Sequence, residues 1–391
     1  MSTILSNRVQ KIKPSATLAV SDKAKQLKDQ GVQIVSMGSG EPDFDTPVNI
    51  QKAAAQAIGD GETRYTAVDG TPKLKKAICE KFKKDNGLDY SENEVMVSSG
   101  GKQVFYNLCQ AILNKGNEII IPAPYWVSYP DIAILADATP VFIKAGLDQE
   151  FKITPEQLES SINDNTKLLI LNSPSNPTGA VYTKPEIESI GAVLERHPQV
   201  HVISDDIYEH IRWEDDEFVN IAMLCPKLKD RTIILNGVSK AYAMTGWRIG
   251  YAAGPKDIIK AMKKIQGQST SNPSSISQAA ALEAISGDQS FINMMVEAFE
   301  RRHNFLVDSL NAIDGIECSQ SRGAFYSFPR VQGLIDRLGL KDDVEFSTYC
   351  LDKISLALVP GSAFGAPGYV RLSFATSMDN LKLAIERLSN I

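Results

Sequence analysis

Short apolar runs alternate with helical stretches from about residue 94 onward, and this alternation constrains the fold more than any other feature of the chain. Runs typical of buried strands begin at Glu94, Glu118, Pro140, Leu168, Val200, Thr232 and Arg248. Helical stretches lie between most of them, for example over residues 102–113, 155–162 and 184–196. Strands that alternate with helices form a mostly parallel sheet with helices on both faces, so we predict an α/β fold.

The pattern changes after Pro255, where a long helical stretch begins and a second group of strands follows it. These later strands are predicted near residues 323–328, 356–359 and 369–374. A chain of 391 residues is long enough for two domains. We predict an N-terminal arm and part of a small domain over residues 1–45, a large domain over residues 46–290, and a small α+β domain over residues 291–391.

Composition and charge exclude several classes of function. A net charge of −6 argues against a nucleic-acid partner, which would require a basic face, and no stretch approaches the apolar length of a membrane span. The five cysteines are odd in number and far apart, so we expect reduced thiols in a cytoplasmic protein. We expect no metal centre, because Pro198 between His197 and His201 argues against the helical spacing of a ligand pair.

Lys240 lies just beyond the predicted strand at residues 232–235, which ends near the chain-breaking Gly237. In α/β proteins, ligands bind at the carboxyl ends of the strands. Arg248 follows Lys240 by eight residues and precedes the next apolar strand. A single lysine is usually a solvated surface charge, but this position makes Lys240 a candidate for a ligand-binding amine.

Gly100, Gly101 and Lys102 lie where one predicted strand ends and a helix begins. The free backbone N–H groups and the helix dipole at such a point can hold a phosphate. The spacing is not that of a P-loop, because Met96 occupies the position of the first glycine. A cation at the start of a helix opposes the dipole, so Lys102 is either solvated or kept for an anionic ligand.

Other polar or aromatic residues near strands each allow two interpretations. Trp126 either packs in the core or lies against a flat ring. Asp205 and Asp206 form either a metal site or, more commonly, a solvated acidic turn. Arg371, in a strand of the second predicted domain, would ordinarily pair with a neighbouring carboxylate.

Residues 236–251, Asn-Gly-Val-Ser-Lys-Ala-Tyr-Ala-Met-Thr-Gly-Trp-Arg-Ile-Gly-Tyr, closely resemble the lysine motif of the class I aminotransferases. Gly-Glu-Pro-Asp-Phe at 40–44 and Asn-Pro-Thr-Gly at 176–179 are also typical of that family. Its members carry pyridoxal 5′-phosphate (PLP) as a Schiff base on the motif lysine. The resemblance implies the PLP-dependent transferase fold type I, with a large domain built on a mostly parallel seven-stranded sheet and a smaller α+β domain.

The resemblance also implies a role for individual residues, with Lys240 as the catalytic lysine. The residues expected to bind the cofactor are Lys240, Gly100, Gly101, Trp126, Asn176, Asp205, Tyr208, Ser239, Arg248 and Tyr65. The residues expected to bind the substrate are Gly40, Lys102, Trp126, Asn176, Arg371, Thr17 and Lys13. In the family, a tyrosine matching Tyr65 reaches the phosphate of the partner subunit, which implies a homodimer with shared active sites. Gly237 stands where the family often has serine, which would remove one phosphate contact.

Within the family, the chain looks most similar to bacterial aspartate aminotransferases in which a lysine in Gly-Gly-Lys-Gln binds the distal carboxylate. Lys102 matches that lysine, and Lys13 matches a position linked to the use of prephenate. Other enzymes of the same fold, such as a broad-specificity or aromatic aminotransferase or an α,β-lyase, would share nearly all these residues. A PLP-binding DNA regulator fits less well, because the N-terminal arm is short and the charge balance is acidic.

Overall fold

The structure is a computed structural model that describes residues 4–14, 16–213 and 216–391. A central sheet of seven strands has the order β2-β8-β7-β6-β5-β3-β4. In that sheet β8 runs opposite to the other six strands, which are parallel to one another, as the sequence predicts for a mostly parallel α/β fold. The strands of the chain are β1 Val35–Ser36, β2 Val95–Ser98, β3 Glu118–Ala123, β4 Thr139–Lys144, β5 Thr166–Asn172, β6 His201–Asp205, β7 Thr232–Gly237, β8 Gly250–Ala253, β9 Tyr326–Ser327, β10 Leu356–Ala357, β11 Val359–Pro360 and β12 Val370–Ser373.

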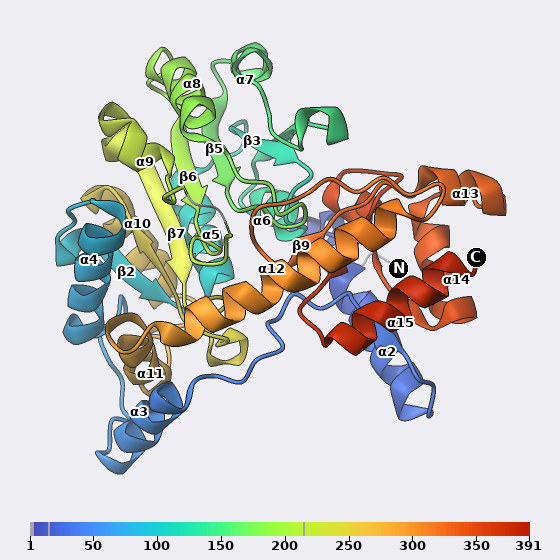
Figure 1. The fold of residues 1–391 in the computed structure, drawn as a ribbon. Helices are drawn as coiled ribbons and strands as arrows, with labels where there is room; N and C mark the ends of the chain where they lie inside the picture. The colour runs from blue at the N-terminus through green and yellow to red at the C-terminus, as the bar shows by residue number, and fades with distance from the viewer. Residues whose placement is uncertain (1–3, 15, 214–215) are drawn as a thin grey trace.

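Helices cover both faces of the central sheet (Figure 1). The side chains of the strands alternate between the two faces, as the period of two requires: Val95 and Val97 join one apolar core, and Met96 joins another. The helices are α1 Asn7–Lys11, α2 Ala16–Asp29, α3 Val48–Gly59, α4 Pro72–Asn86, α5 Gly101–Ile112, α6 Ser128–Leu135, α7 Pro155–Ser161, α8 Lys184–Glu195, α9 Ile221–Leu224, α10 Lys256–Gly267, α11 Ser275–Ser286, α12 Ser290–Asn311, α13 Gln332–Leu338, α14 Asp343–Ile354 and α15 Met378–Ser389.

A second, smaller group of elements lies beside the central sheet, on the right in Figure 1. It contains the antiparallel sheet β11-β12-β9 and the parallel pair β1-β10, which brings the segment near residue 35 to the C-terminal part of the chain. The long helix α12 connects the two groups, because Ile292 joins a core of the central sheet and Met295 joins the core of the smaller group. The domain boundary expected between residues 290 and 291 falls at the start of this connecting helix and therefore stays a prediction.

Several predicted strands are shorter than the apolar runs that suggested them, and the run at 356–359 is divided between β10 and β11, which belong to different sheets. The run at 323–328 forms a strand only at Tyr326–Ser327, because Ala324 adopts a positive φ of 58°. The strand expected from Arg248 begins at Gly250, because Arg248 itself has a φ of 57°. A β-branched or apolar pattern cannot reveal such left-handed positions.

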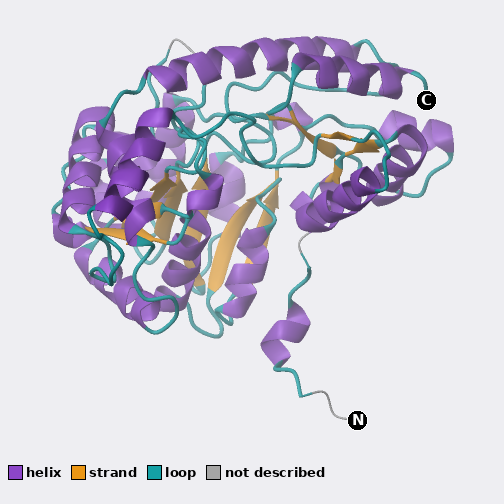
Figure 2. Cartoon of the chain, turned by 90° about the horizontal axis from the view of Figure 1, so that it is seen from below, coloured by secondary structure: helices purple, strands orange, loops and turns teal. Residues whose placement is uncertain are grey.

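In the view of Figure 2, α1 lies below the body of the molecule. It packs beside α6, and its Arg8 forms an ion pair with Asp137 at 3.5 Å. Within the described residues, no helix is both long enough and apolar enough to cross a membrane. The five cysteines all lie in the described part of the chain as free thiols, four of them buried.

Candidate active site

A cavity of about 560 Å³ opens at the carboxyl ends of the parallel strands, where the smaller group of elements meets the central sheet. It gathers residues that are far apart in the sequence. The predicted residues that line it are Thr17, Gly40, Gly101, Lys102, Trp126, Asn176, Asp205, Tyr208, Ser239, Lys240, Arg248 and Arg371.

Lys240 follows β7 and points its amine into this cavity. Its Nζ donates a hydrogen bond to the carbonyl oxygen of Gly40 at 2.6 Å. Burial lowers the pKa of the Lys240 amine to about 8, and the cations Arg371 and Arg248 add to the effect. A lysine whose pKa lies near neutrality can act as a nucleophile or a base at physiological pH. An ordinary lysine cannot, because it stays protonated there.

Asp205 is the last residue of β6, and its carboxylate is buried at the cavity wall. Burial raises the pKa of Asp205 to about 6, although the hydroxyl of Tyr129 donates to Oδ2 at 2.5 Å and opposes the rise. A buried carboxylate of this kind is stabilised by a cationic partner. It is therefore suited to hold a protonated ring nitrogen.

The turn between β2 and α5 forms a possible phosphate cradle. Gly100 has a φ of 95°, and a Cβ on it would lie 2.2 Å from Nη2 of Arg248, so only glycine lets the guanidinium come this close. Gly250 of β8 likewise allows a close approach, here of the strand to the turn, because a Cβ on it would lie 2.3 Å from the backbone nitrogen of Gly101. Backbone N–H groups at the start of a helix beside an arginine make a site for an anion.

Arg371 on β12 reaches the cavity from the smaller group of elements and is 2% exposed. Its Nη1 donates to Oδ1 of Asn176 at 2.9 Å, and its Nη2 donates to the carbonyl oxygen of Gly38 at 2.7 Å. The Nε atom is buried and has no hydrogen-bond partner in the structure. A buried guanidinium with an unsatisfied donor and no carboxylate among these contacts is well prepared for an anionic ligand.

Lys102, at the start of α5, lies with its Nζ 5.2 Å from the ring centre of Trp126. Its pKa is lowered by burial and by the neighbouring Arg248. Lys102 therefore adds a further basic side chain to the cavity that Arg371, Arg248 and Lys240 also line.

Three predicted residues lie at the edge of the cavity or outside its lining. Gly100 supports Arg248 and precedes the lining residue Gly101. Tyr65 is 93% exposed, and Lys13 is exposed with its backbone nitrogen 3.4 Å from Oδ1 of Asp131. Their expected roles stay predictions.

Sequence reasoning missed several residues that shape the site. Tyr129 donates a hydrogen bond to Asp205, and its ring packs edge-on against that of Trp126 with the ring centres 5.2 Å apart. The Tyr326 hydroxyl lies 2.9 Å from that of Tyr208, and the Tyr326 ring lies 4.5 Å from the Arg371 guanidinium. Glu41 also lines the cavity, next to the predicted Gly40. No pattern in the sequence distinguishes Tyr326 from an ordinary aromatic core residue.

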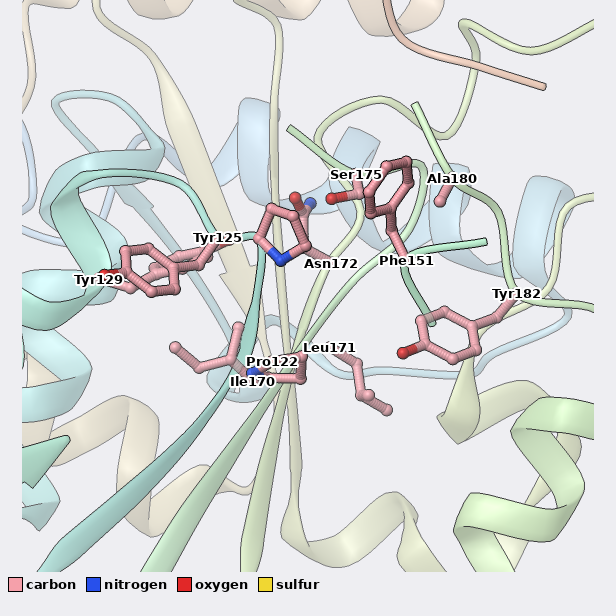
Figure 3. A pocket seen from close by; sticks show the side chains of 11 residues that line it. Pro122, Tyr125, Tyr129, Phe151, Ile170, Leu171, Asn172, Ser175, Ala180 and Tyr182 are labelled. Carbon is pink, nitrogen blue, oxygen red and sulfur yellow. The ribbon is translucent and has the colours of Figure 1, made fainter. Parts of the chain in front are cut away.

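A second, much smaller void lies next to the cavity. Figure 3 shows its lining, with Tyr129 beside Tyr125 on one side, Asn172 near the centre, and Phe151 and Tyr182 on the other side. Its volume of about 20 Å³ leaves room for about one water molecule, so it is not a substrate site. Among the described residues, no group of three or more His, Cys, Asp or Glu side chains is arranged to hold a metal ion.

Known proteins resemble this chain over its whole length. The family described as aminotransferase class I and II matches residues 32–388. The aspartate/prephenate aminotransferase of Nitrosomonas europaea is 55% identical over 99% of both chains. The crystal structure of the aspartate aminotransferase from Rhizobium meliloti superposes with a TM-score of 0.95 at 46% identity, covering 100% of this chain and 98% of that one. The Thermus thermophilus aspartate aminotransferase with maleate gives a TM-score of 0.94 at 42% identity, covering 99% of both chains. This chain therefore belongs to the class I and II aminotransferase family, whose members are enzymes.

Proposed function

We propose that this protein transfers the amino group of L-aspartate to 2-oxoglutarate, giving oxaloacetate and L-glutamate, with PLP as the cofactor. We propose prephenate, which would become arogenate, as a second amino acceptor. The observation that carries the proposal is the buried Lys240 amine, whose pKa is lowered to about 8 within a cavity that also holds Asp205, Arg248 and Arg371. The names of the relatives from Nitrosomonas europaea and Rhizobium meliloti support this choice of reaction.

The residues present fit PLP. Asp205 offers a buried carboxylate, with a pKa raised to about 6, to a protonated pyridine nitrogen. The Gly100–Gly101 turn, Ser239 and Arg248 offer N–H, hydroxyl and guanidinium donors to a phosphate. Asn176 accepts a hydrogen bond from Arg371 through Oδ1, so its Nδ2 can donate to the ring 3-oxygen. Tyr208 lines the same cavity. Trp126 can lie against the ring.

The chemistry divides between the cofactor and the chain. When bound, PLP supplies an aldehyde that joins to an amine and a ring that withdraws electrons from the reacting carbon. The neutral form of Lys240 would take the proton from the substrate Cα and return it at C4′ of the cofactor, because its pKa of about 8 leaves part of the amine unprotonated at physiological pH. The two half-reactions share one site, so the kinetics are ping-pong.

Charge supports a dicarboxylate substrate. Aspartate and the cofactor phosphate together bring about four negative charges into a partly buried cavity, and cations must compensate them. We assign the α-carboxylate to Arg371, whose planar guanidinium suits a bidentate contact, and the distal carboxylate to Lys102. Thr17 lines the cavity, and its buried hydroxyl has no hydrogen-bond partner in the structure. This suits a residue that closes over a bound substrate.

We also propose a cytoplasmic homodimer with shared active sites. Tyr65, at 93% exposure, is an unusually exposed large aromatic residue, and burial against a partner subunit would explain it. Lys13 is exposed as well, and we assign it to the selection of prephenate.

Steady-state assays of the PLP-loaded protein test the proposed reaction. Aspartate with 2-oxoglutarate is expected to give oxaloacetate and glutamate in ping-pong kinetics, and prephenate with an amino donor is expected to give arogenate. Release of ammonia from aspartate, with no transfer of the amino group to 2-oxoglutarate, would instead identify a lyase. A higher kcat/KM for aromatic amino acids than for aspartate would overturn the assignment of the substrate.

A further inference from the structure

A closed cluster of polar residues lies behind the turn that carries Asp205 and Tyr208. Asp206 and Glu209 belong to the same turn and are also buried, at 1% and 4% exposure. Unlike Asp205 and Tyr208, they do not line the cavity. Figure 1 shows α4 beside β2 at the edge of the central sheet. The two helices α4 and α5 pack on opposite faces of the sheet, because their apolar side chains join two different cores. The proposed function gives this cluster no role.

Glu209 is the centre of the cluster. Its Oε1 accepts from the ammonium group of Lys81 on α4, and its Oε2 accepts from Nδ2 of Asn86 at 3.1 Å. Lys81 also donates to Oδ1 of Asn86 at 2.8 Å. Burial alone would raise the pKa of Glu209, but Lys81, His210 and these hydrogen bonds lower it to about 2, so the carboxylate stays charged.

Asn236, the second-last residue of β7, connects the cluster to the loop that carries Lys240. Its Nδ2 donates to Oε1 of Glu209 at 2.6 Å, and its Oδ1 accepts from the backbone nitrogen of Gly237 at 2.7 Å. The single amide therefore fixes the direction in which the chain leaves β7. Ser239 and Lys240 follow within four residues.

The backbone beyond Asn236 has little room to adjust elsewhere. A Cβ on Gly237 would lie 3.0 Å from Cα of Gly250 and 3.1 Å from the side chain of Ile207. Gly250 in turn supports the Gly100–Gly101 turn. A rotation at residues 236–237 would therefore move both the amine of Lys240 and the floor of the phosphate cradle.

We infer that Glu209 is a positioning residue. Through its hydrogen bond to Asn236, it fixes the position of the loop that carries Lys240 relative to the Asp205–Tyr208 turn. The inference rests on the proposed function only in taking the cavity to be a PLP site. One carboxylate, which does not line the cavity, thereby joins the two turns that bring the proposed cofactor-binding residues together.

Two substitutions separate this role from a merely structural one. Asn236→Ala removes the connection and leaves the Lys81–Glu209 ion pair in place. Glu209→Gln keeps an oxygen that can accept from Asn236 but removes the nearer counter-charge of the buried Lys81, whose other carboxylate partner, Asp85, lies at 3.9 Å. Asn220→Ala is the matched control, because it cuts a buried amide contact of 2.7 Å to the neighbouring Asp206. If the alanine variant does not fold, Asn236→Ser serves instead, because serine is too short to reach Glu209.

Three quantities are measured for each variant: the Kd for PLP, from the quenching of tryptophan fluorescence; the urea midpoint of the apoprotein; and kcat and KM for aspartate. For Asn236→Ala we expect the Kd for PLP to rise and kcat to fall by about tenfold each, with KM within about twofold, because one hydrogen bond to a charged group is lost and Arg371 is untouched. For Glu209→Gln we expect a larger fall in the urea midpoint but a Kd within about threefold of the unchanged protein. Asn220→Ala should lower the midpoint only.

The outcomes distinguish the inference from the proposed function. Wild-type Kd and kcat in Asn236→Ala would overturn the positioning role, and so would a loss of PLP affinity that follows the loss of stability across all variants. Failure of the unchanged protein to bind PLP would overturn the proposed function instead.

Discussion

The turn at residues 205–209 has two sides that use the same kinds of groups for different ends. On the cavity side, Asp205 accepts from Tyr129 at 2.5 Å, and Tyr208 pairs with Tyr326. On the far side, Asp206 accepts from Ser204 and Asn220 at 2.6 and 2.7 Å, and Glu209 is neutralised by Lys81. Both aspartates are buried, and burial raises the pKa of each, to about 6 and about 7.

The two sides of the turn differ in which hydrogen-bond donors near them lack a partner. The cavity holds buried donors without a partner, Nε of Arg371 and the hydroxyl of Thr17, together with the cations Lys240 and Arg248. On the far side, the donors and acceptors of the cluster bind one another. A buried polar group without a partner costs free energy, so the two unpartnered donors that line the open cavity are available to a ligand that would satisfy them. Perturbed pKa values alone would not have told the two sides apart.

The largest expected effect follows from removing the amine of the cavity side. Lys240→Ala should lower kcat by at least about 10³–10⁴-fold, because both the covalent link to the cofactor and the proton carrier are lost. Steady-state assays with aspartate check this, and circular dichroism shows whether the fold is kept. A variant that retains normal turnover would remove Lys240 from the reaction.

Replacing each aspartate of the turn tests the two sides directly. Asp205→Asn should lower kcat by about 10²–10³-fold, because a neutral amide cannot stabilise a protonated ring nitrogen. Asp206→Asn should leave kcat within about threefold, since Asp206 does not line the cavity. Equal losses of activity in the two variants, measured at matched protein stability, would contradict the comparison.

The next effect concerns the guanidinium that reaches the cavity from β12. Arg371→Lys keeps the charge but loses the planar pair of donors, so KM for aspartate should rise by about 10–100-fold. The Kd for PLP should rise less than KM, because Arg371 lies apart from the phosphate cradle, although it also orients the cofactor-binding amide of Asn176. An unchanged KM would remove Arg371 from carboxylate binding.

The smallest expected effect comes from the phosphate cradle. Gly100→Ala should raise the Kd for PLP by about tenfold, because the added Cβ would lie 2.2 Å from Nη2 of Arg248 and must displace the guanidinium. Gly116→Ala is the control: its φ of 92° matches the 95° of Gly100, but nothing lies within 4 Å of an added Cβ. Both variants should lose about 1–2 kcal/mol of stability, and a similar Kd in both would contradict the role of Gly100.

The sequence predicted the frame of the site better than its details. The alternation of apolar runs and helices was enough for the parallel sheet, because each strand needs a two-sided apolar cover that leaves a clear pattern. The motif around Lys240 located the lysine loop at the end of β7. Tyr129, Tyr326 and Glu209 escaped prediction because their importance depends on contacts with residues 76, 118 and 27 positions away, which no local pattern encodes.

The covalent attachment of the cofactor tests the central claim most directly. The protein is incubated with PLP, reduced with borohydride, digested and mapped by mass spectrometry. We predict one stoichiometric phosphopyridoxyl adduct on Lys240, and its loss when excess aspartate is added before reduction, because the substrate amine then takes the cofactor. An adduct confined to Lys102 or to surface lysines, or no adduct at all, would contradict the account.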